Sequence, residues 1–531
     1  MKKGIVLILC MVLAGTFAVS CKKTAQQGAG EVMELIVNNS TNPQSLDPTQ
    51  IQGVPEHRLY LALFEGLVRY EPRTAKSLPG VADSWTFNSD QTVITFKLRQ
   101  GIAWSDGTAI TAQQIVDSWL HHLNPDTASE YAYMVGMVVK GAEDYNEGDG
   151  RPEDVAIRAI DPRTFEVTLV GPAPYALDMM AHYAFSPLPM HVIQRHGTNW
   201  TRPENIVVNG PFKLDEYIPN NRIVVSPNEK YWDRANVHLT KITFLPIEDL
   251  NTSYNAFLNG EIDWDTQVPL ARIDEVKLHK DYQVAPELGT YYIIPNIGNN
   301  PHPAIRDARV RRALSMAIDR QELIDNVTKG GQLPALSLVA PTATYQPTPG
   351  NGFNVTEARR LLAEAGYPNG QGLPTFEYIY NTHDGHRIIG EYIQESWKNN
   401  LGVNITLQNM EWATFLDYRR TSRMQLARAG WISDYMDPQN LLDLIITGGG
   451  NNDGAYSNPE YDRLIRQAAT MPDSPQRDAV MRQAEDIGIT RDQALIPIYF
   501  YVSQHMIDVS QWDGWYMNPL DIHPYVGMRR K

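Results

Sequence analysis

Residues 92–119 run Thr92-Val-Ile-Thr-Phe-Lys-Leu98, then the turn Trp104-Ser-Asp-Gly107, then Thr111-Ala-Gln-Gln-Ile115-Val-Asp-Ser-Trp119. The first part alternates apolar and polar side chains, which predicts a strand with one buried face. The Asp-Gly pair tolerates the left-handed backbone geometry of a tight turn. Thr111 is a suitable N-cap, and the apolar residues after it recur at helical spacing. The segment therefore predicts a strand, a turn and a helix in succession.

Extended and helical patterns alternate along the rest of the chain. A helical stripe predicts that Arg311, Arg312, Asp319 and Arg320 face solvent, opposite Val310, Ala313, Leu314, Ala317 and Ile318. A short Ala/Leu/Glu-rich helix over 357–365 is expected to end at Gly366. Strands and helices that alternate in this way form mixed α/β domains.

The composition limits the kind of protein this chain can be. It has 531 residues, and at about 150 residues per domain it would hold three to four domains. Its formal charge of −15 argues against a nucleic-acid partner, because a duplex binder needs clustered Lys and Arg to displace counterions. Its two cysteines cannot supply a disulfide framework or a Cys-rich zinc site.

The first 31 residues predict export and a tether. Lys2 and Lys3 precede an apolar run, 4–14, of 11 residues, which fits a signal peptide and falls short of the roughly 20 needed to span a bilayer. Ala18-Val-Ser20 before Cys21 resembles the cleavage box of a bacterial lipoprotein precursor. We therefore predict a signal peptide over 1–20, a lipid on Cys21 that anchors the protein to a membrane, and a flexible small-residue tether over 21–31. An ordinary secretory signal is the alternative.

Common catalytic motifs are absent from the sequence. There is no Gly-x-x-x-x-Gly-Lys-Ser/Thr, no Gly-x-Ser-x-Gly and no His-Glu-x-x-His. The nearest candidates for a metal pair are His121 with His122, and His383 with His386; such histidines are more often surface or hydrogen-bonding residues than ligands. We predict no metal, no cofactor and no enzyme activity.

A series of motifs carries a resemblance to a known class. Besides the segments quoted above, the motifs are Gln44-Ser-Leu-Asp-Pro48, Leu63-Phe-Glu-Gly-Leu67, Val81-Ala-Asp-Ser-Trp85, Asn209-Gly-Pro-Phe212, Tyr231-Trp232, Arg309-Val-Arg-Arg-Ala-Leu314 and Leu361-Leu-Ala-Glu-Ala-Gly366. In order and spacing they resemble the peptide/nickel class (family 5) of solute-binding proteins that serve ABC importers. The resemblance runs from about residue 33 to the C-terminus and is closest to oligopeptide-binding receptors.

The resemblance implies a periplasmic-binding-protein fold of two α/β lobes, with an additional domain inserted in the first lobe. Lobe I would comprise 32–65, 188–288 and 501–531, the inserted domain II 66–187, and lobe III 289–500. A short peptide would be captured in the cleft between the lobes. The protein would be a monomer that passes its ligand to a membrane permease with ATPase subunits, in the periplasm or on the cell surface.

The resemblance also implies which residues hold the ends of the ligand. Asp434, in Trp431-Ile-Ser-Asp434, matches the aspartate that pairs with the peptide's α-ammonium group, a charge-assisted contact. Arg428 and Arg419 match arginines near the terminal carboxylate, which a guanidinium can bind with two donors. His386 matches a histidine that reaches the carboxylate of longer peptides. Taken alone, Asp434 could be a helix cap or turn residue and Arg419 could be structural.

Other matching positions contact the peptide backbone or line its pockets. A receptor indifferent to sequence holds the main chain, which an exposed strand edge can do. The matching residues are Val54, Tyr131, Thr290, Tyr291, Tyr292, Gly430 and Trp431. Core packing is the alternative role for Tyr291 and Trp431.

Two positions depart from the family pattern. Gln52 stands where an acid is expected and Ser315 where a lysine is expected, which puts a preference for the shortest peptides in doubt. The alternative functions are a receptor for dipeptides, nickel chelates or other small solutes, and a surface adhesin. A peptidase is disfavoured by the absent nucleophile and metal motifs.

Overall fold

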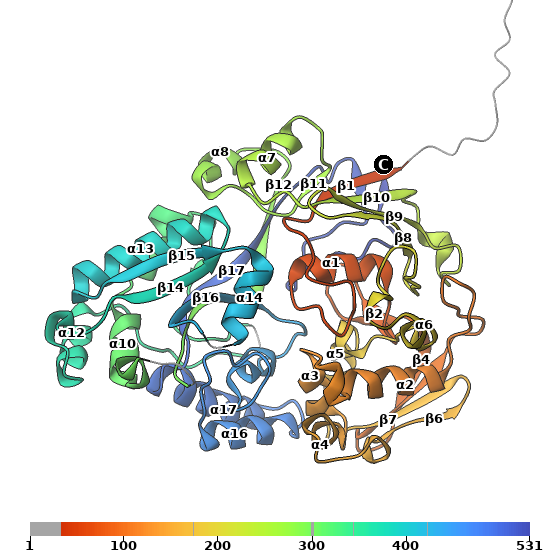
Figure 1. Ribbon diagram of the computed structural model, residues 1–531, viewed down its shortest axis with the longest axis horizontal. Coiled ribbons are helices and arrows are strands. Elements are labelled where there is room, and N and C mark those ends of the chain that lie inside the picture. Colours follow the sequence, from red (N-terminus) through yellow and green to blue (C-terminus); the bar gives the residue numbers. More distant parts are fainter. Residues whose placement is uncertain (1–32, 174, 299–301, 343–344, 422) are drawn as a thin grey trace, which may run out of the picture. The chain divides into compact units, whose positions relative to one another are not determined.

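Two long strands run through the centre of the folded chain (Figure 1). The computed structural model describes residues 33–173, 175–298, 302–342, 345–421 and 423–531, and 33–531 form one compact unit. The predicted signal peptide, Cys21 and the whole of the predicted tether lie outside the described residues. Among the described residues, no helix is both long enough and apolar enough to cross a bilayer.

The strands alternate with helices along the chain, as the sequence predicts. The strands are β1 (Glu34–Asn38), β2 (Val68–Tyr70), β3 (Ser77–Pro79), β4 (Ala82–Phe87), β5 (Val93–Leu98), β6 (Ile157–Asp161), β7 (Thr164–Thr168), β8 (Phe212–Ile218), β9 (Arg222–Pro227), β10 (Lys241–Leu245), β11 (Trp264–Asp265), β12 (Tyr282–Pro295), β13 (Leu333–Pro334), β14 (Phe376–Asn381), β15 (Ile405–Met410), β16 (Leu426–Ile432), β17 (Ile496–Ile507), β18 (Trp512–Asp513) and β19 (Arg529–Arg530).

The α-helices are mostly short, and the longest has 18 residues. They are α1 (Val54–Leu63), α2 (Ala112–Leu123), α3 (Ala132–Val138), α4 (Ala142–Glu147), α5 (Ala176–Met179), α6 (Met190–His196), α7 (Leu250–Leu258), α8 (Ile273–Val276), α9 (Pro303–Arg306), α10 (Ala308–Met316), α11 (Arg320–Leu323), α12 (Val355–Glu364), α13 (Asp384–Leu401), α14 (Trp412–Arg420), α15 (Gln439–Leu442), α16 (Pro459–Ala469) and α17 (Pro475–Glu485).

The largest sheet connects two strand groups through β12 and β17. In the described chain its order is β15-β14-β16-β12-β17-β11-β1-β10-β9-β8, and β13 also pairs with β17. The β14, β15 and β16 strands pair in parallel on one side, while β1 pairs in parallel with β10 and β11 on the other. The antiparallel pair of β12 and β17 links the groups, and Figure 1 shows one group on each side of this pair.

A second sheet forms from the segment quoted first. Its order is β4-β5-β7-β6, and all of it lies within 66–187, the expected inserted domain. The predicted strand is confirmed as β5, with Ile94, Phe96 and Leu98 fully buried. Thr111 is confirmed as the N-cap of α2, because its side chain accepts a hydrogen bond from the Gln114 backbone N–H.

The prediction that the arginines beside the helical stripe face solvent is partly wrong. Arg311 and Arg320 are each only 3 % exposed. Arg311 donates to the backbone carbonyl groups of 305 and 306 and of 492 and 493, and Arg320 donates to those of 315, 318 and 497. A buried guanidinium with several carbonyl acceptors retains the hydrogen bonds it loses from water. Helical periodicity cannot show that a charged residue has such partners.

Candidate functional site

A cavity of about 380 Å³ lies among segments far apart in the sequence. Its walls include Val54 and Tyr131 from the first 140 residues, and Arg428 and Asp434 from the strand β16 and the turn after it. Eight of the eleven predicted peptide-binding residues line it. They are Val54, Tyr131, His386, Arg419, Arg428, Gly430, Trp431 and Asp434. Their convergence makes this cavity the candidate site.

Asp434 lies at one end of β16 with its carboxylate held in place. Its side chain is 13 % exposed. Oδ2 accepts a hydrogen bond from Asn440 Nδ2 at 3.3 Å, and Oδ1 lies 3.3 Å from His182 Nε2. Asn440 Oδ1 in turn accepts from the Asp434 backbone N–H and from the Trp431 indole. The Asn440 side chain therefore fixes both the carboxylate and the turn that carries it.

Arg428 lies on β16 itself, six residues before Asp434. Nη1 donates to Asn381 Oδ1 at 3.0 Å and Nη2 donates to Tyr501 Oη at 3.3 Å. The guanidinium lies over the ring of Tyr291, with its central carbon 5.1 Å from the ring centroid. All of these contacts are with neutral groups, and no carboxylate pairs with Arg428 among the described residues. The protein thus positions this cation and leaves its charge uncompensated.

His383 and His386 lie close to Arg428 in the cavity wall, with ring centroids 4.5 Å apart. Burial and the charge of Arg428 lower the pKa of His383 to about 4. The same two causes lower the pKa of His386 well below its usual value, and His383 lowers it further. His386 is therefore a neutral hydrogen-bonding group at physiological pH, with Nδ1 3.5 Å from Tyr291 Oη.

Arg419 lines the cavity but already has an anionic partner. Its Nε lies 2.5 Å from Asp453 Oδ2, and both side chains are at least 90 % buried. The neighbouring Arg420 donates to Gln52 and forms an ion pair with Glu130 at 2.8 Å. The sequence suggested that Arg419 could be structural, and this ion pair supports that alternative more than a direct contact with ligand.

Two aromatic side chains in the cavity wall stack on each other. The rings of Tyr131 and Trp431 lie 6.2 Å apart at an interplanar angle of 27°. Trp431 is 8 % exposed and Tyr131 is 2 % exposed, so each is largely packed while one edge reaches the cavity. Val54 is 37 % exposed and begins α1, where Pro55 suits the first helical turn.

Most of one edge of β16 has no strand partner among the described residues. Along its other edge, β16 pairs with β12 from Leu426 to Ile432. On the free side, its described pairing with β14 covers only Leu426 and Ala427. At Gly430 a Cβ atom would lie 2.0 Å from Tyr501 Oη, so the missing side chain makes room for the hydroxyl that contacts Arg428.

Three predicted residues do not line the cavity: Thr290, Tyr291 and Tyr292. They lie in β12, which pairs with β16 on one side and β17 on the other, so its main chain has no free edge there. Thr290 and Tyr291 are fully buried and Tyr292 is 4 % exposed. Tyr291 acts from behind the wall, beneath Arg428 and beside His386. Ser315, which stands where the family pattern has a lysine, also lies away from the cavity wall. Its hydroxyl accepts a hydrogen bond from Arg320.

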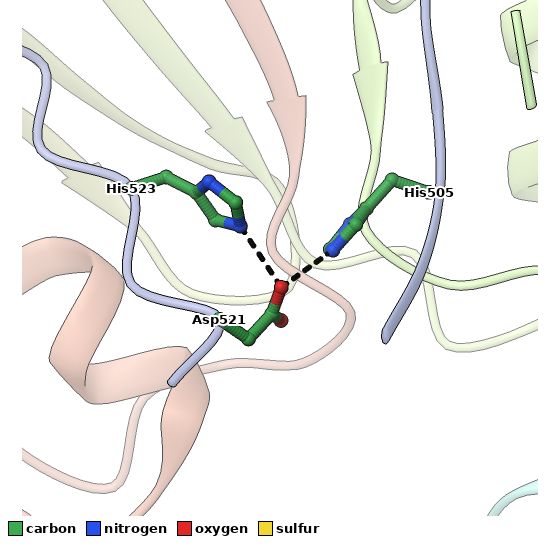
Figure 2. Close-up of side chains that lie close together, drawn as sticks. All are labelled: His505, Asp521 and His523. Atoms are coloured by element: carbon green, nitrogen blue, oxygen red, sulfur yellow. Dashed lines mark hydrogen bonds and ion pairs between the residues drawn. The ribbon is translucent and has the colours of Figure 1, made fainter. Parts of the chain in front are cut away.

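A cluster of charged residues on another wall of the cavity was not predicted from the sequence. It consists of Arg58, Glu287, His505, Asp521 and His523, all of which line the cavity. Figure 2 shows both imidazoles pointing at Asp521; the distances from Asp521 Oδ1 to His505 Nε2 and His523 Nε2 are 2.7 and 2.9 Å. No local motif joins these positions, because they come together only through the fold.

The two histidines and Asp521 lie close enough to hold a metal ion, but their hydrogen bonds do not fit one. The Trp264 indole donates to His505 Nδ1 at 3.2 Å. An indole N–H is only a donor, so His505 carries its proton on Nε2 and donates it to Asp521. A metal ligand needs that lone pair free. The geometry is that of a hydrogen-bonded carboxylate.

Comparisons with known proteins agree over almost the whole chain. The family described as bacterial extracellular solute-binding proteins, family 5, middle region, matches residues 76–453. The periplasmic oligopeptide-binding protein OppA of Salmonella typhimurium is 37% identical over 532 residues, covering 97% of this chain and 96% of that protein.

Solved structures have the same fold. A periplasmic oligopeptide-binding protein of Borrelia burgdorferi matches with a TM-score of 0.90 at 35% identity, covering 94% of this chain and 100% of that one. OppA of Haemophilus influenzae in complex with the peptide RPPGFSPFR matches with a TM-score of 0.89 at 31% identity, covering 94% and 99%. These matches confirm the predicted two-lobe periplasmic-binding-protein fold.

Two structures of one relative differ in how well they match. The Escherichia coli murein tripeptide binding protein matches with a TM-score of 0.89, covering 94% of this chain and 99% of that one. A structure of the murein tripeptide binding protein described as an unliganded open form matches with 0.63, covering 94% and 98%; both are 33% identical. The arrangement of lobes in the present structure is therefore unlike that open form.

Proposed function

Because the chain belongs to family 5 of the bacterial extracellular solute-binding proteins, we propose that it captures short peptides in the cavity and delivers them to the permease of an ABC importer. It is a transport receptor and not an enzyme. Relatives named for oligopeptide binding, and the related structure that holds a nonapeptide, support peptides as the ligand.

One observation carries the proposal: two opposite, uncompensated charges stand at the ends of one free strand edge. Asp434 has no Lys or Arg partner among the described residues, and its nearest charged or chargeable neighbour is His182. Arg428 has only neutral partners. A zwitterionic peptide would bring an ammonium group to Asp434 and a carboxylate to Arg428, each as a charge-assisted contact.

The spacing of the two charges suits a short extended chain. Four residues of β16, at about 3.3 Å per residue, separate Arg428 from the last strand residue, Ile432, and Asp434 lies two residues further on, in the turn. An extended chain spans about 3.3–3.6 Å per residue. The gap therefore accepts a peptide of about three to five residues.

The free edge of β16 holds the peptide between its charged ends. An added strand is held by main-chain hydrogen bonds, which every peptide can make, while its side chains alternate into pockets. Trp431, Tyr131 and Val54 would line these pockets, and Gly430 would present the edge. His386 would reach the carboxylate of longer ligands. Arg419, with Thr290, Tyr291 and Tyr292, would support the site from behind the peptide.

Calorimetry tests this proposal with a pool of tri- to pentapeptides in free, N-acetylated and C-amidated forms. We expect the free peptides to bind, and each capped form to bind at least about tenfold more weakly, since removing one partner of a desolvated charge costs about 2–5 kcal/mol. Asp434→Asn should lose the discrimination against N-acetylated peptides, whereas the exposed Asp473→Asn should keep it. Equal binding of free and acetylated peptides by the native protein would remove Asp434 from this role.

We also propose that Cys21 carries a lipid and that the mature protein is a monomer at a membrane surface. The export-signal pattern before Cys21 supports the anchor. Incorporation of labelled palmitate into the native protein, but not into Cys21→Ala, is the expected result, and equal labelling would contradict it.

We further propose a division into three parts: lobe I comprises 32–65, 188–288 and 501–531, the inserted domain II comprises 66–187, and lobe III comprises 289–500. The strands β12 and β17 cross the proposed boundary between lobes I and III and would act as the hinge.

A further inference from the structure

The charged wall of the cavity contains one acid that neither the protein nor the ends of a peptide would neutralise. This wall consists of Arg58 from α1, Glu287 from β12, His505 from β17, and Asp521 and His523 from the C-terminal segment. Every charged member must be balanced by a partner or shift its protonation state, because burying an isolated charge is very costly.

Asp521 is satisfied and ionised. Burial raises the pKa of its carboxyl group. Charge interactions and hydrogen bonds with His505 and His523 lower that pKa by a larger amount, so the net shift is downward. Arg58 is only 8 % exposed and makes no hydrogen bond or ion pair within the described chain. Burial lowers the pKa of Arg58, and Asp521 gives the strongest of the charge interactions that raise it. Arg58 therefore interacts more strongly with Asp521 than with Glu287.

Glu287 is the acidic residue of this wall that remains without a partner. It is 6 % exposed, lines the cavity, and makes no hydrogen bond or ion pair to any described residue; Oε1 is fully enclosed without a partner. Burial raises the pKa of Glu287 well above its usual range, the nearby Asp521 raises it further, and Arg58 opposes this only in part. An irregular pairing between Pro286 and Thr290 interrupts the β12 ladder at this point, and such bulges redirect side chains.

The other charges in the cavity have assigned partners. Arg419 pairs with Asp453, and Asp434 and Arg428 receive the two ends of the peptide. Glu248 is exposed and accepts a hydrogen bond from Thr41. Among the described residues of the cavity wall, Glu287 is then the only buried carboxyl group without a hydrogen bond or an ion pair.

We propose that Glu287 forms a subsite for a cationic side chain, lysine or arginine, of the bound peptide. The inference rests on the proposed capture of peptides. A ligand ammonium or guanidinium group would supply the missing counterion to the unpartnered carboxyl group. The backbone N–H of Ser433 donates to the Leu288 carbonyl at 2.8 Å, which places Glu287 near the Asp434 end of the cavity. The cationic side chain would therefore belong to a residue near the amino end of the peptide.

The test compares peptides that differ only in one charge. A set of tetrapeptides carries lysine at one position in turn, and a matched set carries Nε-acetyl-lysine there, which keeps the length of the side chain and removes its charge. We expect the native protein to prefer lysine at one position by about tenfold or more, which corresponds to about 1.4 kcal/mol. Glu287→Gln should reduce that preference to about one, with acetyl-lysine peptides bound as by the native protein. The matched control Glu248→Gln, also in the cavity wall, should retain the preference.

Proton release gives a second readout on the native protein. A ligand cation lowers the pKa of the neighbouring carboxyl group, so lysine peptides should release more protons on binding at pH 7 than acetyl-lysine peptides do. Calorimetry in buffers of different ionisation enthalpy measures the difference. A lysine preference that survives in Glu287→Gln, or equal proton release by both peptides, would overturn the subsite. Failure of both the lysine and the acetyl-lysine peptides to bind the native protein would instead overturn peptide capture itself.

Discussion

At the scale of single residues, His383 combines two roles that depend on its protonation. It is the N-cap of α13, where Nδ1 accepts the Gly385 backbone N–H at 3.1 Å, and Nε2 contacts Gln267 at 3.1 Å. Its neutral form is required, because a protonated Nδ1 cannot accept a hydrogen bond. Burial and Arg428 lower the pKa of His383 to about 4. The unfolded chain therefore binds this proton at a higher pH than the folded chain does.

The sign of the pH dependence follows from this difference. A histidine with a lowered folded pKa contributes full stability above its unfolded value near 6.5 and loses it as the pH falls toward 4. Between pH 7 and pH 5, His383 should cost the native protein about 2 kcal/mol of unfolding free energy. His383→Asn keeps a good N-cap and should be about 2 kcal/mol less sensitive to this change in urea denaturation. The cap variant His302→Asn in α9 is the control; a His383→Asn profile parallel to the native one would contradict the prediction.

The residues found from sequence and those missed differ in how local their signals are. Asp434 and Arg428 belong to one strand and its turn, so a single segment carried both the charges and their spacing. Glu287 and Arg58 are separated by more than 200 residues and neither has a neighbouring pattern that marks it. Their meaning depends on burial and on missing partners, which sequence does not contain. The burial of Arg311 and Arg320 was also missed, because part of their carbonyl acceptors, at 492, 493 and 497, lies far away in the sequence.

At the scale of elements, the strand edge of β16 depends on one glycine. A Cβ at position 430 would lie 2.0 Å from Tyr501 Oη and 3.0 Å from Tyr501 Cζ. Gly430→Ala should therefore displace Tyr501, and with it the hydrogen bond that positions Arg428. We expect peptide affinity to fall about tenfold or more. The control Gly352→Ala has its nearest neighbour at 3.9 Å, a side-chain carbon of Leu336, and should bind as the native protein does.

Thermal unfolding measured with the binding assay separates a local effect from misfolding. Overpacking costs about 1–3 kcal/mol, so Gly430→Ala is expected to remain folded with a modestly lower Tm. Native affinity in a folded Gly430→Ala protein would show that Tyr501 does not position Arg428 for the ligand.

The sequence predicted strands and helices near the site better than it predicted which strand edges are free. Thr290, Tyr291 and Tyr292 were expected at the ligand because their segment matches backbone-contacting positions. In the structure β12 is paired on both sides, and its side chains are buried on both faces. An uninterrupted apolar run identifies a central strand. Sheet order depends on long-range pairing, and it decides that β16, and not the 290–292 part of β12, borders the cavity.

At the scale of the whole molecule, polar contacts connect the two proposed lobes beside the cavity. Arg420, at the end of α14, forms an ion pair with Glu130 at 2.8 Å and donates to Gln52. Asn451 accepts from Gln52 at 2.9 Å and donates to Tyr133 Oη at 3.0 Å. Arg420 and Asn451 belong to lobe III in the proposed division, and their partners belong to lobe I and domain II. These contacts exist only while the lobes are together, so they favour the closed arrangement over an open one.

Removing this connection should weaken ligand retention without changing any contact to the ligand. The ion pair is about four-fifths buried on both sides, and after allowance for screening by solvent its loss is worth about 1 kcal/mol. Because apparent affinity scales with the population of the closed form, Arg420→Ala should bind peptides about three- to tenfold more weakly. The change should lie mainly in faster dissociation, measured by stopped-flow displacement.

Arg423→Ala is the matched control, since Arg423 pairs with Asp417 within the same lobe. X-ray scattering should show the ligand-free Arg420→Ala protein more expanded than the native one; identical scattering and dissociation rates in both would mean that the contacts between lobes do not set the closure equilibrium.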